Sequence, residues 1–139
     1  MLRAVLDVGV IVSGVLTAEG PPGQILDRWR NGELDVIVSP SLLAELERVL
    51  AYDRVRSRVT PQDAEELVSE LRWHALVVDD PPEVEAGLTA DAGDDYLVAL
   101  ARAAGADVLV SGDPHITGVE RPEPPVLTPR QLVEILDGG

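Results

Sequence analysis

The chain has 139 residues, a length that favours one domain built around one hydrophobic core. Eleven basic residues, all of them Arg, stand against twenty-five Asp and Glu residues, and the net charge of −14 excludes a general polyanion-binding surface. The absence of cysteine excludes disulfides, thiolate nucleophiles and Cys-ligated zinc, and it suits a reducing cytoplasm. We expect no membrane segment, because no apolar run approaches the roughly 20 residues that span a bilayer.

Short β-branched runs alternate with segments of helical period in the first half of the chain. We predict a first strand at residues 3–7, then a turn and a helix that Gly32 can terminate, and a second strand at residues 35–39. The pairs Ser39–Pro40 and Thr60–Pro61 each supply a helix cap followed by a first-turn proline. These signals predict two further helices, and ALVVDD after them reads as a third strand.

The second half of the chain continues the alternation. Asp91 can cap a helix that ends at Gly105, and the apolar run DVLVSGD that follows reads as a buried strand. A strand VL and a helix close the chain, and Thr128 with Gln131 supplies the elements of a capping box. We therefore expect one three-layer α/β/α domain over residues 1–139, with a four- or five-stranded, mainly parallel sheet.

Two acids follow predicted strands directly. Asp7 ends the first strand, and Asp113 comes just after the strand within DVLVSGD. Open parallel sheets bind ligands at the carboxyl ends of their strands. Either acid alone is better explained by an Asx-turn at a strand end, but two such ends make a functional interpretation competitive.

Asp94 lies in the helix between these strands. At 3.6 residues per turn it shares a face with Leu97 and Val98, the side expected to pack on the sheet, whereas Asp95 points away toward Arg102. The alternative role for Asp94 is stabilisation of the helix dipole, worth at most about 1 kcal/mol. That role favours an exposed position, so we prefer a functional role for Asp94.

A fourth acid comes from the helix after Ser39. Glu45 and Glu47 border opposite edges of its apolar stripe, and periodicity alone does not choose between them. Clustered carboxylates repel, and a pair at 4 Å costs about 4 kcal/mol at an effective dielectric near 20, so a cation must offset the charge. Oxygen ligands without His or Cys select Mg²⁺ or Mn²⁺. The chemistry indicated is metal-assisted phosphodiester hydrolysis.

These residues together resemble the PIN-domain family, in particular toxin components similar to VapC ribonucleases. The resemblance covers nearly the whole chain and is carried by VLDVGVIVSGVL, SPSLLAELERVL, DAGDDYLVALARAAGADVLVSGD and VLTPRQLVEIL. It implies that Asp7, Glu45, Asp94 and Asp113 bind one or two Mg²⁺ or Mn²⁺ ions that activate water for RNA cleavage. It also implies a homodimer and a small antitoxin protein that occludes the acidic pocket.

The chain departs from the family pattern beside the first acid. Val8 and Gly9 stand where the family has Thr or Ser and then Asn or Ser, so a polar partner for Asp7 is missing there. Such partners orient metal ligands, and losing one weakens metal binding or activity by roughly 10- to 100-fold. The resemblance is therefore compatible with a slow nuclease, or with an inactive module that binds RNA or a protein partner.

The remaining candidate residues carry weaker signals. The basic residues Arg54, Arg56 and Arg58 would share one side only in an extended segment, and a solvated connector is the preferred interpretation. His115, after Asp113, is better read as an exposed loop residue than as an outer ligand. Phosphate-transfer families with acidic pockets at strand ends normally require a lysine, and this sequence has none.

Overall fold

The computed structural model describes residues 1–84, 92–112 and 124–138, without the side chains of residues 92–94. One five-stranded sheet lies at its centre, in the order β3-β2-β1-β4-β5, and all four strand pairings are parallel. This confirms the sheet that the sequence predicted. The strands are β1 (Arg3–Leu6), β2 (Asp35–Val38), β3 (Leu76–Val77), β4 (Val108–Val110) and β5 (Val126–Leu127).

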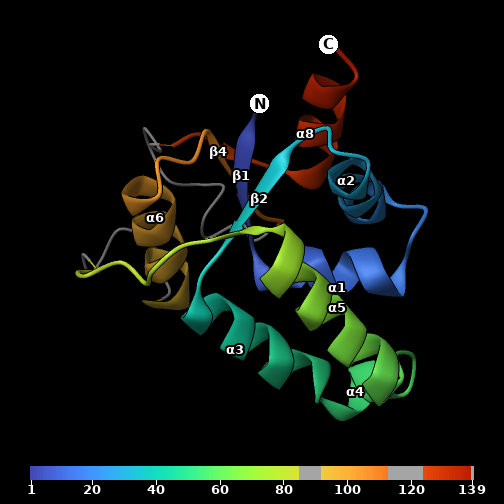
Figure 1. Cartoon of the computed structure of the whole chain (residues 1–139). Coiled ribbons are helices and arrows are strands. Elements are labelled where there is room, and N and C mark those ends of the chain that lie inside the picture. Colours follow the sequence, from blue (N-terminus) through green and yellow to red (C-terminus); the bar gives the residue numbers. More distant parts are fainter. Residues whose placement is uncertain (85–91, 113–123, 139) are drawn as a thin grey trace.

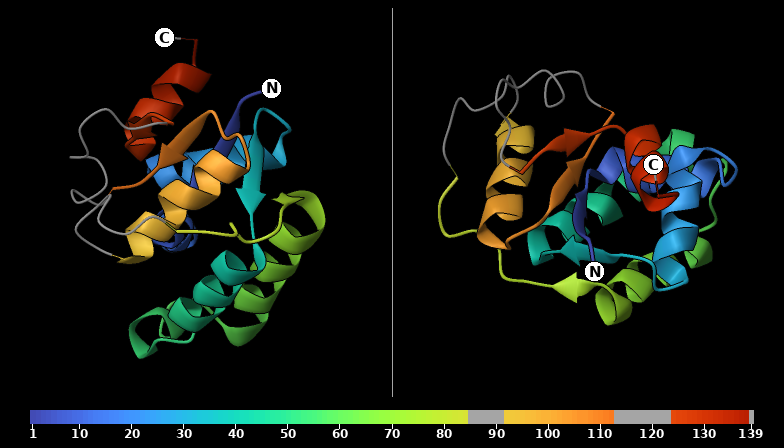
Figure 2. Two further views of the ribbon diagram at one scale, coloured as in Figure 1. Left: turned by 90° about the vertical axis from the view of Figure 1, so that its left-hand side faces the viewer. Right: turned by 90° about the horizontal axis from the view of Figure 1, so that it is seen from above.

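Helices cover both faces of the sheet. Figures 1 and 2 show α6 on one face and α2 with α8 on the opposite face, while α3 and α5 extend together beyond the carboxyl ends of the strands. The three-layer α/β/α class is therefore confirmed. The helices are α1 (Val8–Leu16), α2 (Pro21–Arg30), α3 (Pro40–Leu50), α4 (Asp53–Arg56), α5 (Pro61–His74), α6 (Ala92–Ala103) and α8 (Pro129–Leu136).

Local cap signals fix the starts of three helices. The hydroxyls of Ser39, Thr60 and Thr128 each accept a hydrogen bond from a backbone N–H in the first turn, and a proline follows each of them. The predicted capping box at α8 is present, because the side chain of Gln131 also accepts from the backbone of Thr128. These boundaries were readable from short sequence patterns alone.

The segment after β1 differs from the prediction of a turn and one helix. Two helices form, and α1 begins at Val8 because Asp7 caps it directly: Asp7 Oδ1 accepts from Gly9 N–H at 3.1 Å. The helices α1 and α2 then pack closely. A Cβ atom on Gly14 would lie 2.7 Å from Leu26, and one on Gly23 would lie 2.2 Å from the Ala18 carbonyl oxygen, so both positions require glycine.

The core is aliphatic, as the absence of Phe requires. Leu, Val, Ile and Ala from all layers fill it, and Trp29 is the one aromatic side chain among the buried hydrophobic residues of the described ranges. Trp73 is 78% exposed on α5 and belongs to the surface. No helix in the described part of the chain is both long and apolar enough to cross a membrane.

Candidate functional site

Three polar residues follow three adjacent strands at the carboxyl edge of the sheet. Asp7 follows β1, Ser39 follows β2 and Ser111 follows β4. The register pairs Leu6 with Val110, and Val5 with Ile37, so the next residues along the strands come side by side. Both serines are fully buried. A polar row therefore crosses the centre of the sheet at the edge where parallel sheets bind ligands.

Asp7 is held in this row by hydrogen-bond donors of the folded chain. Its Oδ1 accepts from the backbone N–H of Gly9 at 3.1 Å, and its Oδ2 accepts from the hydroxyl of Ser111 at 2.9 Å. The sequence predicted that a polar partner was missing, because it considered only Val8 and Gly9. Ser111 on β4 supplies a hydroxyl donor to Asp7, and the sequence reasoning missed it because 104 residues separate the two.

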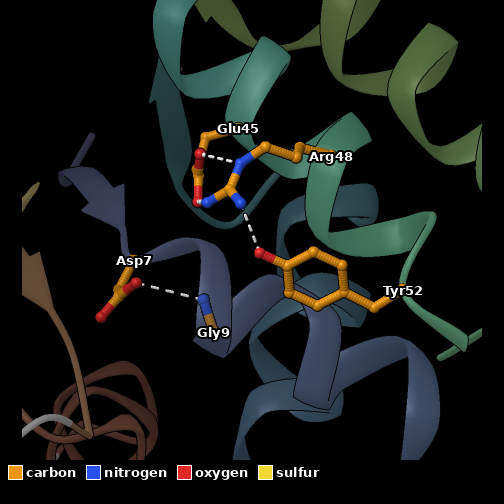
Figure 3. A network of polar contacts seen from close by, with 5 residues as sticks. All are labelled: Asp7, Gly9, Glu45, Arg48 and Tyr52. Atoms are coloured by element: carbon orange, nitrogen blue, oxygen red, sulfur yellow. Dashed lines mark hydrogen bonds and ion pairs between the residues drawn. The ribbon is translucent and has the colours of Figure 1, made fainter. Parts of the chain in front are cut away.

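Glu45 is fixed by a cation instead. It lies on α3, and its carboxylate forms a two-point ion pair with Arg48, of which the Nε–Oε2 distance is 2.9 Å. Figure 3 shows the carboxylate and the guanidinium facing each other, with the Tyr52 hydroxyl on another nitrogen of Arg48. The hydrogen bond to Glu45 is the main reason why the pKa of Arg48 is raised. Glu45 and Arg48 are three residues apart on one helix, a spacing that favours an ion pair and that is visible in the sequence.

The other two proposed ligands are described less completely. Asp94 lies in the first turn of α6, but its side chain is outside the described residues. Leu97 and Val98, which share its helical face, are 7% and 6% exposed. Asp113 lies outside the described residues, as do Asp91 and His115.

Asp95 was expected to point away from the sheet-packing side of this helix, toward Arg102, and such a position implies an exposed side chain, which is not observed. Asp95 is only 4% exposed, and it has interaction partners. Asp95 and Val98 are three residues apart and therefore lie on the same side of the helix, and Val98 is buried as well. The buried surface of α6 is thus wider than the single stripe that the helical period suggested.

A hydrogen-bonded network joins α6 to the end of β2 and to the chain after β3. The hydroxyls of Ser39 and Tyr96 are 2.6 Å apart, and Tyr96 donates to Asp80. Asp80 also accepts from the N–H and the hydroxyl of Ser41, at 3.1 and 2.8 Å. These donors, Tyr96 foremost, lower the pKa of Asp80, while burial and then Asp80 raise the pKa of Tyr96.

The described residues supply part of a metal site. Asp7 offers fixed carboxylate oxygens, each with a lone pair beyond its one hydrogen bond, and such hard oxygen donors fit Mg²⁺ or Mn²⁺. Within residues 1–84, 92–112 and 124–138, no three His, Asp or Glu side chains gather closely enough to hold a metal ion. The side chains of Asp94 and Asp113, the remaining proposed ligands, lie outside the described residues.

The arginine-rich segment does not form an extended basic face. Arg54 and Arg56 belong to the short helix α4, so the alternation that would align the three side chains is absent. Arg54 lies over the ring of Tyr52, 5.8 Å from its centroid, and Arg58 donates to the carbonyl of Leu16 at 3.0 Å. Two of the three arginines therefore have local structural contacts.

The parallel strand order and the helices on both faces define an α/β protein. Asp7 and Ser111 lie at the carboxyl edge of its sheet, the edge where such proteins bind ligands. The profile of the PIN domain family matches residues 3–115, and the chain belongs to this family. The family resemblance found in the sequence is thereby confirmed. A comparison with curated proteins gave no significant match.

Solved structures with this fold are distant in sequence. PAE2754 from Pyrobaculum aerophilum is 16% identical with a TM-score of 0.65, and the match covers 99% of this chain and 91% of that one. VapBC2 from Rickettsia felis, bound to a DNA fragment from their promoter, is 14% identical with a TM-score of 0.61. FitAcB from Neisseria gonorrhoeae is 18% identical with a TM-score of 0.57. Both of these matches cover 91% of this chain and 98% of the other.

Proposed function

We propose that this chain, as one domain over residues 1–139, is a Mg²⁺- or Mn²⁺-dependent endoribonuclease that acts as the toxin of a toxin–antitoxin pair in the cytoplasm. Asp7, Glu45, Asp94 and Asp113 are the proposed ligands. The observation that carries the proposal is the carboxylate of Asp7, held by Ser111 and Gly9 at the carboxyl edge of a PIN-domain sheet. PIN domains are generally nucleases, which gives the reaction class.

The chain's own residues supply fixed negative charge in this reaction. A divalent ion bound there would make a bound water acidic and stabilise the charge that develops on the phosphate. Asp7 presents its carboxylate at a fixed place, since both of its oxygens have donors and its backbone N–H is bonded to the Val110 carbonyl at 2.9 Å. Asp94 belongs to the first turn of α6, and this helix packs on β1 and β4. Asp113 follows Ser111 by two residues.

Substrate RNA must bind despite a net charge of −14. Arg56 and Arg72 line an open groove together with Glu47 and Glu65, so this groove has as many acidic as basic side chains. We therefore assign phosphate binding mainly to the metal centre itself. Cleavage should depend on divalent ion concentration more steeply than on the concentration of monovalent salt.

The direct test is cleavage of single-stranded and structured RNA by the purified chain with Mn²⁺ or Mg²⁺. We expect a chelator to abolish cleavage and Asp94→Asn to abolish it as well, because that substitution removes a ligand charge at nearly constant volume. Cleavage that persists unchanged in Asp94→Asn would come from a contaminating nuclease, and the proposal would then have no support.

A matched pair on α3 tests which glutamate serves the site. Glu45 and Glu47 are two residues apart and both are ion-paired with an arginine, Arg48 and Arg72. Their side chains are similarly exposed, at 44% and 54%. Glu45→Gln should lose metal-dependent cleavage, and Glu47→Gln should retain it. Equal activity of the two variants would remove Glu45 from the site.

The second candidate function is a PIN-fold module without catalytic activity that binds RNA or a protein partner. The ion pair at Glu45 favours it, because the guanidinium of Arg48 bonds to both carboxylate oxygens and neutralises the charge that would attract a metal ion. This candidate predicts RNA binding or partner binding that survives chelation, with no cleavage at any Mn²⁺ concentration. The cleavage experiment above separates the two candidates.

We further propose a homodimer and a small antitoxin that covers the acidic edge. The similarity in fold to VapBC2 and FitAcB supports the antitoxin, while the homodimer rests on the family resemblance alone. Light scattering of the purified chain measures its oligomeric state. Co-expression with the product of a neighbouring short reading frame tests the antitoxin, which should co-purify and inhibit cleavage. Separate elution of the two proteins would count against it.

A further inference from the structure

The hydroxyl of Tyr96 lies where three separate segments of the chain meet. It contacts the hydroxyl of Ser39, at the end of β2, and the carboxylate of Asp80, three residues after β3. Ser39 is fully buried, and the Tyr96 side chain is half-buried on α6. Neither β2 nor β3 is a main packing partner of α6, which lies against β1 and β4. The hydroxyl therefore adds a second, lateral attachment of the helix.

The proton positions in this network follow from its geometry. Asp80 accepts, since its donors include the backbone N–H of Ser41 and the Tyr96 hydroxyl. Tyr96 has one hydroxyl proton and gives it to Asp80, so Ser39 must donate to Tyr96. Ser39 in turn accepts from the backbone N–H of Leu42 at 3.3 Å. With this assignment each of the two hydroxyls donates in one direction, and the network restrains the orientation of α6.

This orientation matters for the proposed metal site because Asp94 lies two residues before Tyr96 in the first turn of the same helix. Packing of Leu97 and Val98 sets the depth of α6 on the sheet. Apolar contacts have little directional preference, so they leave rotation and sliding of the first turn less restricted. A hydrogen bond from Tyr96, the residue just after that turn, to the end of β2, beside β1 and Asp7, restricts both movements.

We propose that Tyr96 is a positioning residue for the acidic site: through Ser39 and Asp80, its hydroxyl fixes the first turn of α6, and with it Asp94, relative to Asp7. The inference rests on the proposed metal-dependent function. Tyr96 itself contacts neither substrate nor metal. Its role is to keep two carboxylates from different elements at the separation that one cation requires.

The test is Mn²⁺ binding to the full chain, measured by calorimetry for the wild type and Tyr96→Phe. This substitution removes only the hydroxyl and changes no charge. We expect the Kd for Mn²⁺ to rise about 10-fold, the lower end of the effect of losing an outer partner of a metal ligand. In cleavage assays, the Mn²⁺ concentration for half-maximal rate should rise likewise, with a smaller change in the rate at saturating Mn²⁺.

Thr60→Ala is the matched control. It also deletes one side-chain hydroxyl that holds a helix, since Thr60 caps α5 at 3.1 Å from the N–H of Asp63. Figure 1 shows the start of α5 beside α4, on the far side of the molecule from α6. We expect a lower unfolding midpoint for this variant and wild-type Mn²⁺ affinity. An equal loss of Mn²⁺ affinity in both variants would reduce the Tyr96 effect to general destabilisation and overturn the inference.

The outcomes separate the inference from the proposed function. If the wild type binds Mn²⁺ and Tyr96→Phe binds it equally well, the positioning role is overturned while the metal site stands. If the wild type binds no Mn²⁺, the metal site fails and the positioning role fails with it. If Tyr96→Phe does not fold, Asp80→Ala and Asp80→Asn replace it. Of these two variants, only Asp80→Asn keeps an acceptor for the Tyr96 hydroxyl. Weaker Mn²⁺ binding by Asp80→Ala than by Asp80→Asn would support the inference, and equal binding would overturn it.

Discussion

Asp7 and Glu45, the two proposed ligands whose side chains are described, are held in opposite ways. Asp7 has neutral donors, a backbone N–H and the hydroxyl of buried Ser111, which fix the carboxylate and leave its charge for a cation. Glu45 has the guanidinium of Arg48, which fixes the carboxylate and neutralises it. If the proposed metal site is correct, a metal ion would meet an unneutralised carboxylate at Asp7, whereas at Glu45 it would have to displace a competing cation.

The largest expected effect comes from removing the charge of Asp7. Asp7→Asn should lower metal-dependent cleavage by more than about 100-fold, the upper end of what loss of an outer partner causes, because a ligand itself is lost. Asn is as good a helix cap as Asp, so unfolding by urea should be nearly unchanged. Asp7→Ala should lose the same activity and also about 1 kcal/mol of stability.

These two variants separate the role of Asp7 as the cap of α1 from its proposed role as a metal ligand. Circular dichroism and urea titration measure the first, and RNA cleavage with Mn²⁺ measures the second. Near wild-type cleavage in Asp7→Asn would show that Asp7 acts only as a helix cap. The contrast between Asp7 and Glu45 would then have no bearing on function.

The next effect is at Ser111. Ser111→Ala removes the hydroxyl donor of Asp7 Oδ2 from a fully buried position. Calorimetry should show Mn²⁺ binding weakened by about 10-fold, and urea titration should show a loss of about 1 kcal/mol of stability. Ser111→Cys, which fills similar space with a weaker donor, should give an intermediate affinity. Wild-type affinity in Ser111→Ala would mean that Gly9 alone orients Asp7.

A smaller effect of opposite sign is expected on the Glu45 side. Arg48→Met keeps most of the side-chain length but removes the competing cation, so Mn²⁺ should bind a few-fold more tightly. Arg72→Met is the control: Arg72 pairs with Glu47 and is 53% exposed, against 60% for Arg48. It removes the same charge from the same pair of helices. Equal tightening in both variants would reflect general electrostatics and would leave no specific competition at Glu45.

The sequence predicted those parts of the molecule that short-range signals determine. Caps with a following proline located α3, α5 and α8, and apolar runs located the strands. Between β1 and β2 the sequence predicted a turn and one helix, whereas two helices form, and the first of them, VGVIVSGVL, is rich in β-branched residues. Its helical state depends on the cap at Asp7 and on close packing against α2, which Gly14 allows. Such tertiary contacts override local propensity.

At the candidate site, too, the sequence predicted what local patterns determine and missed contacts between distant segments. That Asp7 follows a strand was readable, and the pairing of Glu45 with Arg48 was readable from their spacing. Ser111 was missed because only the parallel register of β1 and β4 brings it to Asp7. The contact between Tyr96 and Ser39 joins segments 57 residues apart and leaves no periodic signal. Sequence reasoning thus finds candidate ligands more readily than the side chains that hold them in place.

The smallest expected effect concerns Asp80, a third carboxylate, which, like Asp7, is held by neutral donors. The bond from Tyr96, followed by the bonds from Ser41, lowers the pKa of Asp80 below its ordinary value of 3.8. Because the folded pKa is lowered, the stabilisation is complete above the ordinary pKa and is lost as the pH falls through the folded pKa. Asp80→Asn has no such titration. Between about pH 5 and about pH 3 the wild type should therefore lose slightly more stability than Asp80→Asn in urea titrations.

Solvent screening at this exposed carboxylate keeps the difference small. Parallel acid profiles of the two proteins would contradict the assignment of Asp80 as a held carboxylate. In that case neutral donors would fix a carboxylate only where the donor is buried, as Ser111 is beside Asp7. A divergence of the profiles would instead show that neutral donors alone fix a carboxylate at the surface, and would extend the Asp7 pattern along the edge of the sheet to the end of β3.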